Sequence, residues 1–371
     1  MSSMTSSTPA HVARRARAVS AALTAVALLL LFSAFAAAES PSYPAIEPDY
    51  DYETVQPPGT FSIVALDPET GQLAVGVQSN TIAVGSRTRW GMGGVAAIAS
   101  QASSNPMFGE IGVLLLQRGF SPQEAMEMMV RMDNGALNRQ FAIIDIHGRT
   151  AAWTSPQITD WKGHLCGENY CVQGNTLTGP EVILAMAEAF ETTEGPLAER
   201  VLAALEAGEA AGGDRRGTMS AGLLVMLPRS IAGYGDWQLD LRVDESDAPL
   251  VELRRILNAV RAGQVGNVNA YLQAGDYEGA LGVIAQALAL DPGRDASYVQ
   301  MADVYLRMGN VPKAIEALAT AIKLNPKVFN QILRDSSFAA VHDHPDFLAL
   351  GDISQFRPLP PSAPSPDGLK R

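Results

Sequence analysis

The feature that most constrains the fold is a repeat with a period of 34 residues in the last third of the chain. Each unit has two predicted helices that meet at a glycine, and a proline that stops the second helix. The matching pairs one period apart are Tyr271 and Tyr305, Gly275 and Gly309, Ala280 and Ala314, Ala287 and Ala321, Leu290 and Leu324, and Pro292 and Pro326. Because such units stack to bury a shared core, this period predicts an all-helical repeat module.

The period and these positions resemble the tetratricopeptide repeat, and the resemblance implies a module that binds a peptide or protein. We expect helix pairs at about 264–290 and 296–324, with the alanines at close helix crossings. Gln264 stands where an aromatic residue is usual, so the first helix should be the weaker one. Two repeats bury little core on their own. Residues 329–350 are therefore predicted to form a helical cap that is interrupted at Pro345.

The first 38 residues have the three parts of a secretion signal. Three arginines form a basic start, residues 18–35 form an apolar run, and three alanines at 36–38 form a small-residue exit. This pattern predicts cleavage before Glu39 and a periplasmic or secreted protein. An uncleaved membrane anchor is the alternative, because the apolar run is just long enough to span a bilayer. The small-residue exit favours cleavage.

The composition excludes several classes of partner. Loss of residues 1–38 would change the formal net charge from −12 to −15, which argues against nucleic acid and anionic membranes as partners. No later segment is apolar enough to span a bilayer, so we predict no stable membrane anchor. The five histidines have no metal-ligand spacing, and no nucleotide-binding glycine loop occurs, so neither metal nor cofactor is predicted. The oligomeric state is not predicted.

The two cysteines, Cys166 and Cys171, lie close together in the segment Cys-Gly-Glu-Asn-Tyr-Cys. In an oxidising compartment a close pair favours a disulfide, and Gly167 and Asn169 suit the turn between them. A metal site is the first alternative, but it needs more ligands than His164 can add. A redox-active pair is the second, although its usual spacing is two residues. We expect a structural disulfide.

Residues 60–260 combine short apolar strands with helices, which predicts an α+β domain. The strands at 60–66 and 72–79 form a hairpin around a Pro- and Gly-containing turn, and 141–146 and 150–154 form another. Because hairpins dominate, the sheets should be mainly antiparallel with helices layered on them. Helices are predicted at 106–117, from Ser121, at 181–190, at 197–207 and at 249–260.

Six stretches of this region resemble the bacterial family called domain of unknown function 1028. They are Thr-Phe-Ser-Ile-Val-Ala at 60–65, Gly-Val-Gln-Ser at 76–79, Gln101 through Gly109, Gln-Gly-Asn at 173–175, Gly-Gly-Asp-Arg-Arg-Gly at 212–217 and Asp-Leu-Arg-Val-Asp at 240–244. The family is assigned to the Ntn-hydrolase-like (N-terminal nucleophile) superfamily. The resemblance implies a four-layer αββα sandwich, two antiparallel sheets between helix layers. Superfamily membership implies hydrolysis of amide bonds by an N-terminal Thr, Ser or Cys, which is an analogy from fold.

Thr60 is the candidate nucleophile that this resemblance implies. An N-terminal Thr supplies both a hydroxyl and, in its own α-amine, the base that takes the hydroxyl proton. Thr60 opens the first strand, where such a nucleophile lies, and Gly59 before it permits a strained turn. Residues 39–59 would remain attached after signal cleavage, as a linker or pro-segment, so a second cut is required. The alternative is that Thr60 is a β-branched residue that only starts a strand.

Further polar residues are candidates to line the same cleft. Ser79 and Asn80 end the strand beside the first one, and Asn105 and Asn175 can donate to an oxyanion or make turns. In a Gly-rich loop, Asp214 and Arg216 can form a bidentate pair that serves the site or fixes the loop. The candidate substrate-binding or oxyanion residues are therefore Ser79, Asn80, Asn105, Asn175, Asp214 and Arg216.

Two hypotheses for function follow from these observations. In the first, the protein is an exported amidohydrolase with Thr60 in the largest polar cleft, and the repeats recruit a peptide or protein. The substrate is then a small amide or a peptide. In the second, the α+β domain is a non-catalytic module that binds a ligand or protein. Residues 351–371, rich in Pro and Ser, are predicted to be a disordered tail.

Overall fold

The computed structural model of the chain describes residues 59–228 and 237–354. The predicted signal peptide and the predicted segment 39–59, except Gly59, lie outside the described residues. The same is true of residues 355–371 of the predicted tail. The prediction that this tail starts at residue 351 is wrong, because helix α14 (Pro345–Ser354) continues to Ser354. Leu350 packs against the apolar core of the repeat module and so anchors the last turns of this helix.

The first of two sheets is built around β1, the strand that begins with Thr60. Its six strands are all antiparallel to their neighbours and lie in the order β10-β9-β2-β1-β8-β7. Their bounds are Thr60–Asp67 for β1, Gln72–Ser79 for β2, Gly163–Gly167 for β7, Tyr170–Asn175 for β8, Ser220–Met226 for β9 and Trp237–Val243 for β10. The predicted hairpin of β1 and β2 is confirmed, and it pairs Thr60 with Ser79.

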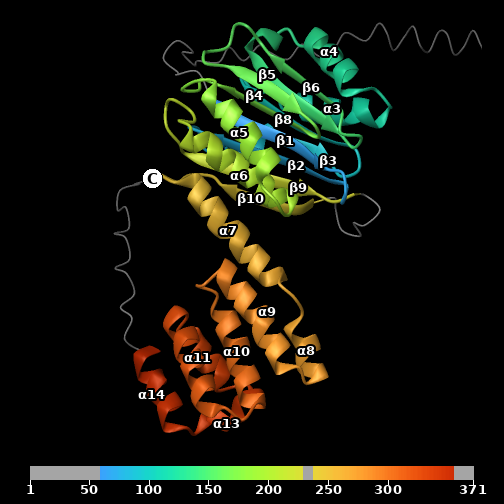
Figure 1. Ribbon diagram of the computed structural model, residues 1–371. Coiled ribbons are helices and arrows are strands. Elements are labelled where there is room, and N and C mark those ends of the chain that lie inside the picture. The colour runs from blue at the N-terminus through green and yellow to red at the C-terminus, as the bar shows by residue number, and fades with distance from the viewer. Residues whose placement is uncertain (1–58, 229–236, 355–371) are drawn as a thin grey trace, which may run out of the picture. The chain divides into compact units, whose positions relative to one another are not determined.

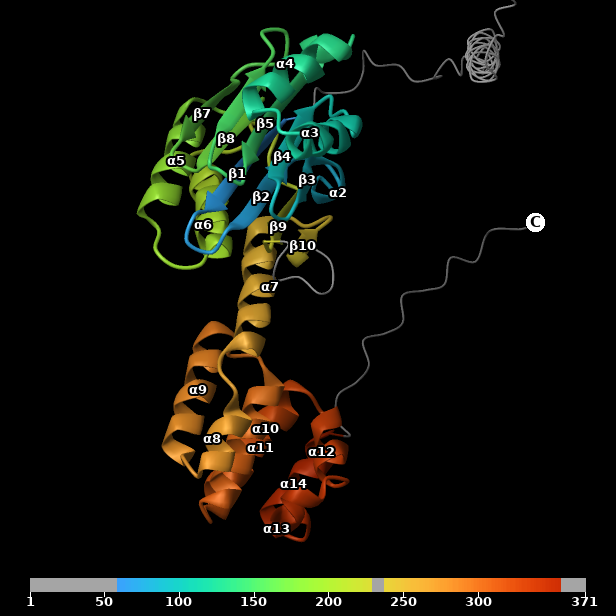
Figure 2. The ribbon, with the colours of Figure 1, turned by 90° about the vertical axis from the view of Figure 1, so that its right-hand side faces the viewer.

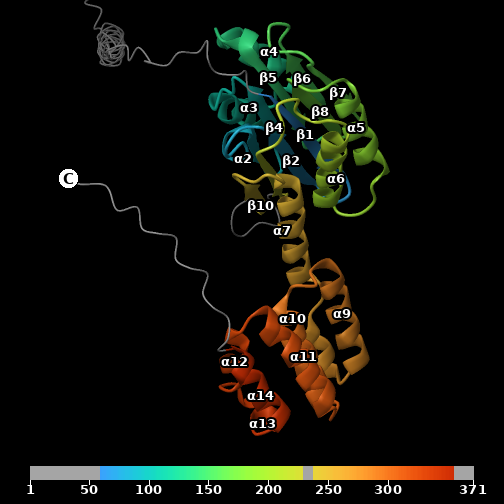
Figure 3. The ribbon, with the colours of Figure 1, turned by 90° about the vertical axis from the view of Figure 1, so that its left-hand side faces the viewer.

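The second sheet is antiparallel with the order β3-β4-β5-β6. Its strands are β3 (Arg89–Met92), β4 (Ala96–Ala102), β5 (Arg139–Asp145) and β6 (Thr150–Thr154). Apolar residues of β1 and β2, such as Val64 and Val75, pack against Ala97 of β4 and Ala142 of β5. The two sheets therefore face each other across a buried apolar layer. Figures 2 and 3 show the two sheets stacked face to face.

Helices cover the outer face of each sheet (Figure 1). The helices α5 (Glu181–Thr192), α6 (Leu197–Ala210) and α7 (Pro249–Gln264) share one core with the six-stranded sheet. The other sheet packs against α3 (Met107–Gln117) and α4 (Pro122–Met132). The short α2 (Gly85–Thr88) and η1 (Ala136–Asn138) lie in loops. The mixed helix-and-sheet class is confirmed, and the layers run helix, sheet, sheet, helix.

The predicted helix start at Ser121 illustrates how local sequence sets these elements. The Ser121 hydroxyl accepts from the backbone N–H of Glu124, and the Glu124 carboxylate accepts from the backbone N–H of Ser121. This capping box satisfies two backbone donors that the first turn of a helix leaves free. Pro122 follows at the first helical position, where its missing N–H costs nothing.

The repeat module has the predicted helix pairs (Figure 1). They are α8 (Val268–Ala274) with α9 (Tyr277–Leu290), and α10 (Asp295–Arg307) with α11 (Val311–Leu324). Gly275 and Gly309, which join the helices of each pair, have positive φ, and Ala280 and Ala314 are fully buried. As predicted, the opening helix of the first repeat is the less extensive one: α8 has 7 residues, whereas α10, which opens the second repeat, has 13. A cap follows, made of α12 (Lys327–Ile332), η2 (Ser336–Phe338), α13 (Ala339–His342) and α14, which starts at Pro345.

The predicted disulfide between Cys166 and Cys171 is confirmed. The two cysteines lie directly opposite each other on β7 and β8, which form a hairpin that the sequence analysis did not predict. Asn169 turns this hairpin with φ of 63°, a conformation that Asn tolerates better than most residues.

Candidate functional site

Thr60 is held at one end of the six-stranded sheet by both neighbouring strands. Its register partners are Ser79 on β2 and Asn175 on β8, and only 3% of its surface is exposed. It lines a cavity of about 230 Å³, together with Thr81, Gln101 and residues of α2. The Thr60 side chain therefore faces a cavity among polar groups and not the apolar core.

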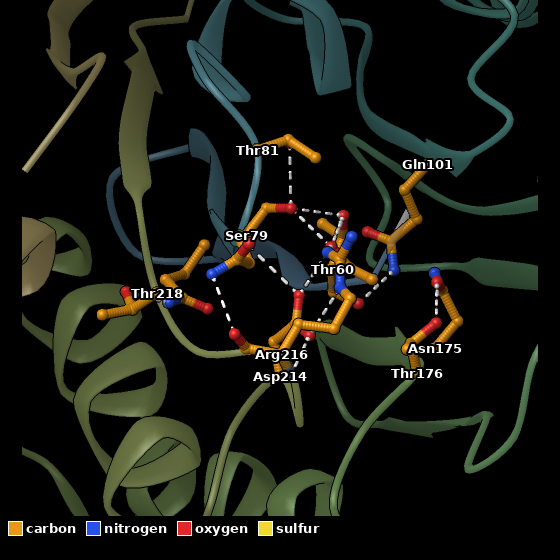
Figure 4. Close-up of polar contacts among 12 residues, drawn as sticks. Thr60, Ser79, Thr81, Gln101, Asn175, Thr176, Asp214, Arg216 and Thr218 are labelled. Atoms are coloured by element: carbon orange, nitrogen blue, oxygen red, sulfur yellow. Dashed lines mark hydrogen bonds and ion pairs between the residues drawn. The ribbon is translucent and has the colours of Figure 1, made fainter. Parts of the chain in front are cut away.

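The carbonyl oxygen of Gly59, just before Thr60, is surrounded by donors. The residues that supply them, Thr60, Ser79 and Arg216, lie close together in Figure 4. Thr60 Oγ1 lies 2.5 Å from it, and Arg216 Nη2 donates to it at 2.8 Å. The Ser79 hydroxyl also donates to it over a short contact. Since Thr60 Oγ1 is also 3.1 Å from Ser79 Oγ, its single proton has two alternative acceptors. Donors aimed at one carbonyl oxygen are the arrangement that stabilises negative charge on that oxygen.

Asp214 and Arg216 form the predicted bidentate pair. Arg216 Nε lies 3.0 Å from Asp214 Oδ1, and Nη2 lies 2.6 Å from Oδ2. The Asp214 side chain is fully buried, and its Oδ2 also accepts from the backbone N–H of Asn80 at 3.2 Å. The Asn80 amide in turn donates to the carbonyl of Arg216 at 3.1 Å. The pair thus fixes its loop, as one of the two predicted alternatives has it, and it holds the guanidinium against the Gly59 carbonyl.

Gly59 fits this place because it has no side chain. A Cβ on this residue would lie 2.7 Å from Asp214 Oδ2 and 2.8 Å from the Cβ of Thr176. These distances are shorter than real Cβ contacts, and the buried ion pair has little room to move. A larger residue in place of Gly59 would therefore displace the Asp214–Arg216 pair or Thr176.

Buried amides of glutamine fill the space between the sheets next to Thr60. Gln101 on β4 donates to the Thr60 carbonyl at 3.1 Å and to Gln140 Oε1 at 2.8 Å, and it accepts from Ser62 Oγ at 2.6 Å. Gln140 on β5 accepts a further bond from Asn175, and both glutamines are at most 1% exposed. Because an unpaired buried amide costs about 1–3 kcal/mol, this network fixes the positions of all its members.

Backbone strain gathers around the same cavity. Of the four non-glycine residues with positive φ in the described chain, three are Ala83, Ala102 and Thr176. Ala102 lines the cavity, Ala83 precedes Val84 in its wall, and Thr176 lies against Gly59. Such conformations cost about 1–3 kcal/mol each and are concentrated at functional sites. These three strained residues therefore lie at or beside the Thr60 cavity.

Two expectations about the cleft are wrong. The Thr60 cavity is not the largest in the described residues, because one of about 440 Å³ lies at the opposite end of β4, next to Gly94 and His147. The glutamine side chains occupy much of the space beside Thr60, which explains the difference. Asn105 does not join the cluster either: it accepts from the N–H of Met107 at the start of α3 and donates to Asp133 at 3.4 Å. The turn-forming alternative for Asn105 applies.

One carboxyl group beside the site is partly buried and incompletely hydrogen-bonded. Glu209 on α6 lies against the loop that carries Asp214, and its Oε2 has no hydrogen-bond partner in the described chain. Burial, and then the negative charge of Asp214, raise the pKa of Glu209.

No group of three or more potential metal ligands occurs among the described residues. In the same residues no helix has the length and apolar character needed to cross a membrane.

Comparison with known families decides where the domain belongs. The model of a family of unknown function, DUF1028, matches residues 60–253, more than half of the chain. The chain belongs to the DUF1028 family. The tetratricopeptide repeat model matches residues 271–332 of the repeat module. A comparison with curated proteins gave no match.

Solved structures include another DUF1028 protein. A crystal structure from Silicibacter pomeroyi matches with a TM-score of 0.50 and 33% sequence identity, over 54% of this chain and 84% of that one. Anbu, an ancestral β-subunit from Yersinia bercovieri, matches with a TM-score of 0.26 and 14% identity, over 53% of this chain and 92% of that one.

The sequence analysis missed several residues of this DUF1028 site. Gln101, named only within a stretch that resembles the family, and Gln140 were not among the candidate site residues, because each is one polar residue near the end of an apolar strand. A signal was present, since a glutamine stands near an end of each of β2, β4, β5 and β8 and all four are buried. Arg87 of α2 was missed as well, because four residues carry no periodic pattern.

Proposed function

We propose that the DUF1028 domain is an amide hydrolase of the N-terminal-nucleophile type, with Thr60 as its nucleophile. The observation that carries this proposal is the set of donors around the Gly59 carbonyl oxygen, from Thr60, Ser79 and Arg216. The layering of two antiparallel sheets between helices supports an Ntn-hydrolase-like sandwich, which is an argument from fold alone.

The first reaction in this proposal is cleavage of the chain's own Gly59–Thr60 bond. Thr60 Oγ1 attacks the Gly59 carbonyl carbon, and Arg216 and Ser79 stabilise the negative charge that develops on the oxygen. The C–N bond then breaks, the nitrogen takes up the hydroxyl proton, and an ester links Gly59 to Thr60. This step already frees the α-amine of Thr60. Water then hydrolyses the ester, so that Gly59 leaves as a carboxylate and the Thr60 hydroxyl is restored.

The freed amine completes the catalytic group. Its pKa of about 8 suits a base at neutral pH, and it lies on the same residue as the hydroxyl that it activates. Departure of Gly59 also removes the oxygen that Arg216 Nη2 and Ser79 Oγ contact, which leaves these donors open to a substrate carbonyl. Asp214 keeps the guanidinium in place for this step.

Location and recruitment form the second part of the proposal. The signal-like residues 1–38 and the Cys166–Cys171 disulfide support a periplasmic or secreted protein. The tetratricopeptide repeats support binding of a peptide or protein by the C-terminal module. Such a partner would bring its amide bonds near the hydrolase domain.

A non-catalytic binding module is the competing function, and one observation favours it. Arg216 and Asp214 satisfy each other, and Arg216 and Ser79 hold the Gly59 carbonyl. This arrangement is also what a permanent structural attachment of the preceding chain would need.

Intact-mass analysis of the exported protein separates the two functions. We expect wild type and Thr60→Ser to start at residue 60, and Thr60→Ala to start at Glu39, because only the first two have a hydroxyl. Thr192→Ala, which removes a threonine hydroxyl at the end of α5 outside the Thr60 cavity, is the control and should be cut like wild type. A folded wild-type chain that starts at Glu39 would favour the binding module.

A further inference from the structure

The cavity beside Thr60 has one charged side chain, Arg87 of α2. The other lining residues are three threonines, a serine, a glutamine and two small apolar residues. The Arg87 side chain is exposed, and its Nη2 donates to the carbonyl of Ile82 at 2.6 Å. The Arg87 carbonyl accepts from Trp90 Nε1 and from Ser104 Oγ at 3.2 and 3.1 Å. One hydrogen bond therefore ties the guanidinium to the Ile82 carbonyl, and two more fix the backbone of Arg87 beside the cavity.

This charge has no carboxylate opposite it. In the described chain, no ion pair involves Arg87, whereas Arg89, Arg139, Arg149 and Arg216 of the same domain each pair with an aspartate. The cavity lining has no acidic residue either. In a chain with a formal net charge of −12, an unpaired guanidinium beside a nucleophile is a specific source of positive potential.

We propose that this cavity selects small substrates that carry a carboxylate near the amide, with Arg87 binding the carboxylate. The inference rests on the proposed role of Thr60, since it assigns the substrate of the same site. The planar guanidinium matches a carboxylate through paired hydrogen bonds. The volume of about 230 Å³ is below the range of roughly 300–1,000 Å³ for drug-sized ligands, so the substrate is small.

Binding of a matched pair of probes tests this proposal on the full chain. N-acetylglycine has an amide and a carboxylate, and N-acetylglycinamide has nearly the same shape without the charge. We expect ligand-observed NMR titrations to show the anionic probe binding at least about tenfold more tightly to wild type, the effect of a charge-assisted hydrogen bond.

Variants of Arg87 test whether this residue causes the preference for the anionic probe. Arg87→Gln should reduce it to within about twofold, and Arg87→Lys should keep part of it because charge remains without the planar fork. The control is Arg118→Gln, which removes the same charge from an exposed position at the end of α3, outside the cavity. Arg118→Gln should keep the wild-type preference.

The result of this binding test can be told apart from the result of the test for hydrolase function. Equal affinity of wild type for the two probes, or no binding of N-acetylglycine at millimolar concentration, overturns the substrate proposal even where mass analysis finds Thr60 freed. A preference that survives in Arg87→Gln also overturns it. A chain that is never cut at Thr60 removes the hydrolase function, while an Arg87-dependent preference would still support an anion-selective cavity.

Discussion

The two parts of the described chain differ in what their cores contain. The core of the repeat module includes one buried polar residue, Ser297, whereas the α+β domain buries sixteen polar or charged residues. Many of these sixteen surround Thr60, among them Ser79, Gln101 and Asp214. A repeat core needs only apolar residues of matching size. Buried polar groups are costly unless each finds a partner, so this concentration points to a use beyond folding.

Removal of one partner of the buried ion pair should give the largest loss of stability. Asp214→Asn leaves Arg216 buried without its counter-charge, and we expect the free energy of unfolding to fall by about 3–5 kcal/mol. All four tryptophans lie between residues 90 and 237, so tryptophan fluorescence during urea unfolding reports the α+β domain. The matched control is Glu127→Gln in the exposed Arg131–Glu127 pair, which should cost less than about 1 kcal/mol. Similar costs for both variants would remove the contrast between buried and exposed polar groups.

Loss of one amide from the glutamine network should have a smaller effect. Gln101→Leu keeps the size of the side chain but removes one hydrogen bond each from Ser62 Oγ, Gln140 Oε1 and the Thr60 carbonyl, at a cost of about 1–3 kcal/mol. Tryptophan fluorescence again measures unfolding. Gln117→Leu on the exposed face of α3 is the control and should change stability little. A neutral Gln101→Leu would mean that the network does not fix the site.

The repeat module should respond to volume and not to polarity. Ala314 is fully buried, and Ala314→Leu should overpack the α10–α11 crossing at a cost of about 1–3 kcal/mol. The exposed Ala270→Leu on α8 is the control. Thermal unfolding followed by far-ultraviolet circular dichroism detects the helices. An Ala314→Leu variant that melts like wild type would show that no close crossing exists there.

The smallest expected effect is a pH dependence from Glu209. Because its pKa is raised in the folded protein, the folded state holds the proton to higher pH than the unfolded chain. Stability is therefore lost as the pH rises from the ordinary carboxyl range through the raised pKa. Glu209→Gln, which carries no charge, should be more stable than wild type at neutral pH and equal to it below the ordinary range. Glu69→Gln, at an exposed turn, is the control; a gain for Glu209→Gln that persists at low pH would contradict this cause.

Local patterns predicted much of the fold. The β1–β2 hairpin, the capped start of α4 and the helix pairs of the repeats each depend on residues close together in sequence. The β7–β8 hairpin was missed because its strands are short and contain glycine and histidine among few apolar residues. Secondary structure can thus be predicted from sequence where a repeat period or a helix-capping motif is present.

The site was only half predictable for a related reason. Asp214 and Arg216 are two residues apart in one loop, so their pairing could be inferred from sequence. Gln101 and Gln140 become neighbours only because β4 and β5 pair and then face β1 across the sheet interface. Asn105 neither contacts Thr60 nor lines its cavity, because its side chain accepts from the backbone N–H of Met107 at the start of α3. Contacts that depend on the meeting of two sheets cannot be read from local patterns.

The most direct test of the central claim is a time course on the purified uncut chain alone. The chain is refolded with no other protein present, and mass spectrometry follows release of the segment that ends at Gly59. We predict first-order release that does not depend on protein concentration, continues in Thr60→Ser and is absent in Thr60→Ala. Arg216→Lys should slow release, because it loses the planar fork that holds both Asp214 and the Gly59 carbonyl. A folded wild-type chain that stays uncut, or a Thr60→Ala chain that is cut at the same rate, would contradict the account.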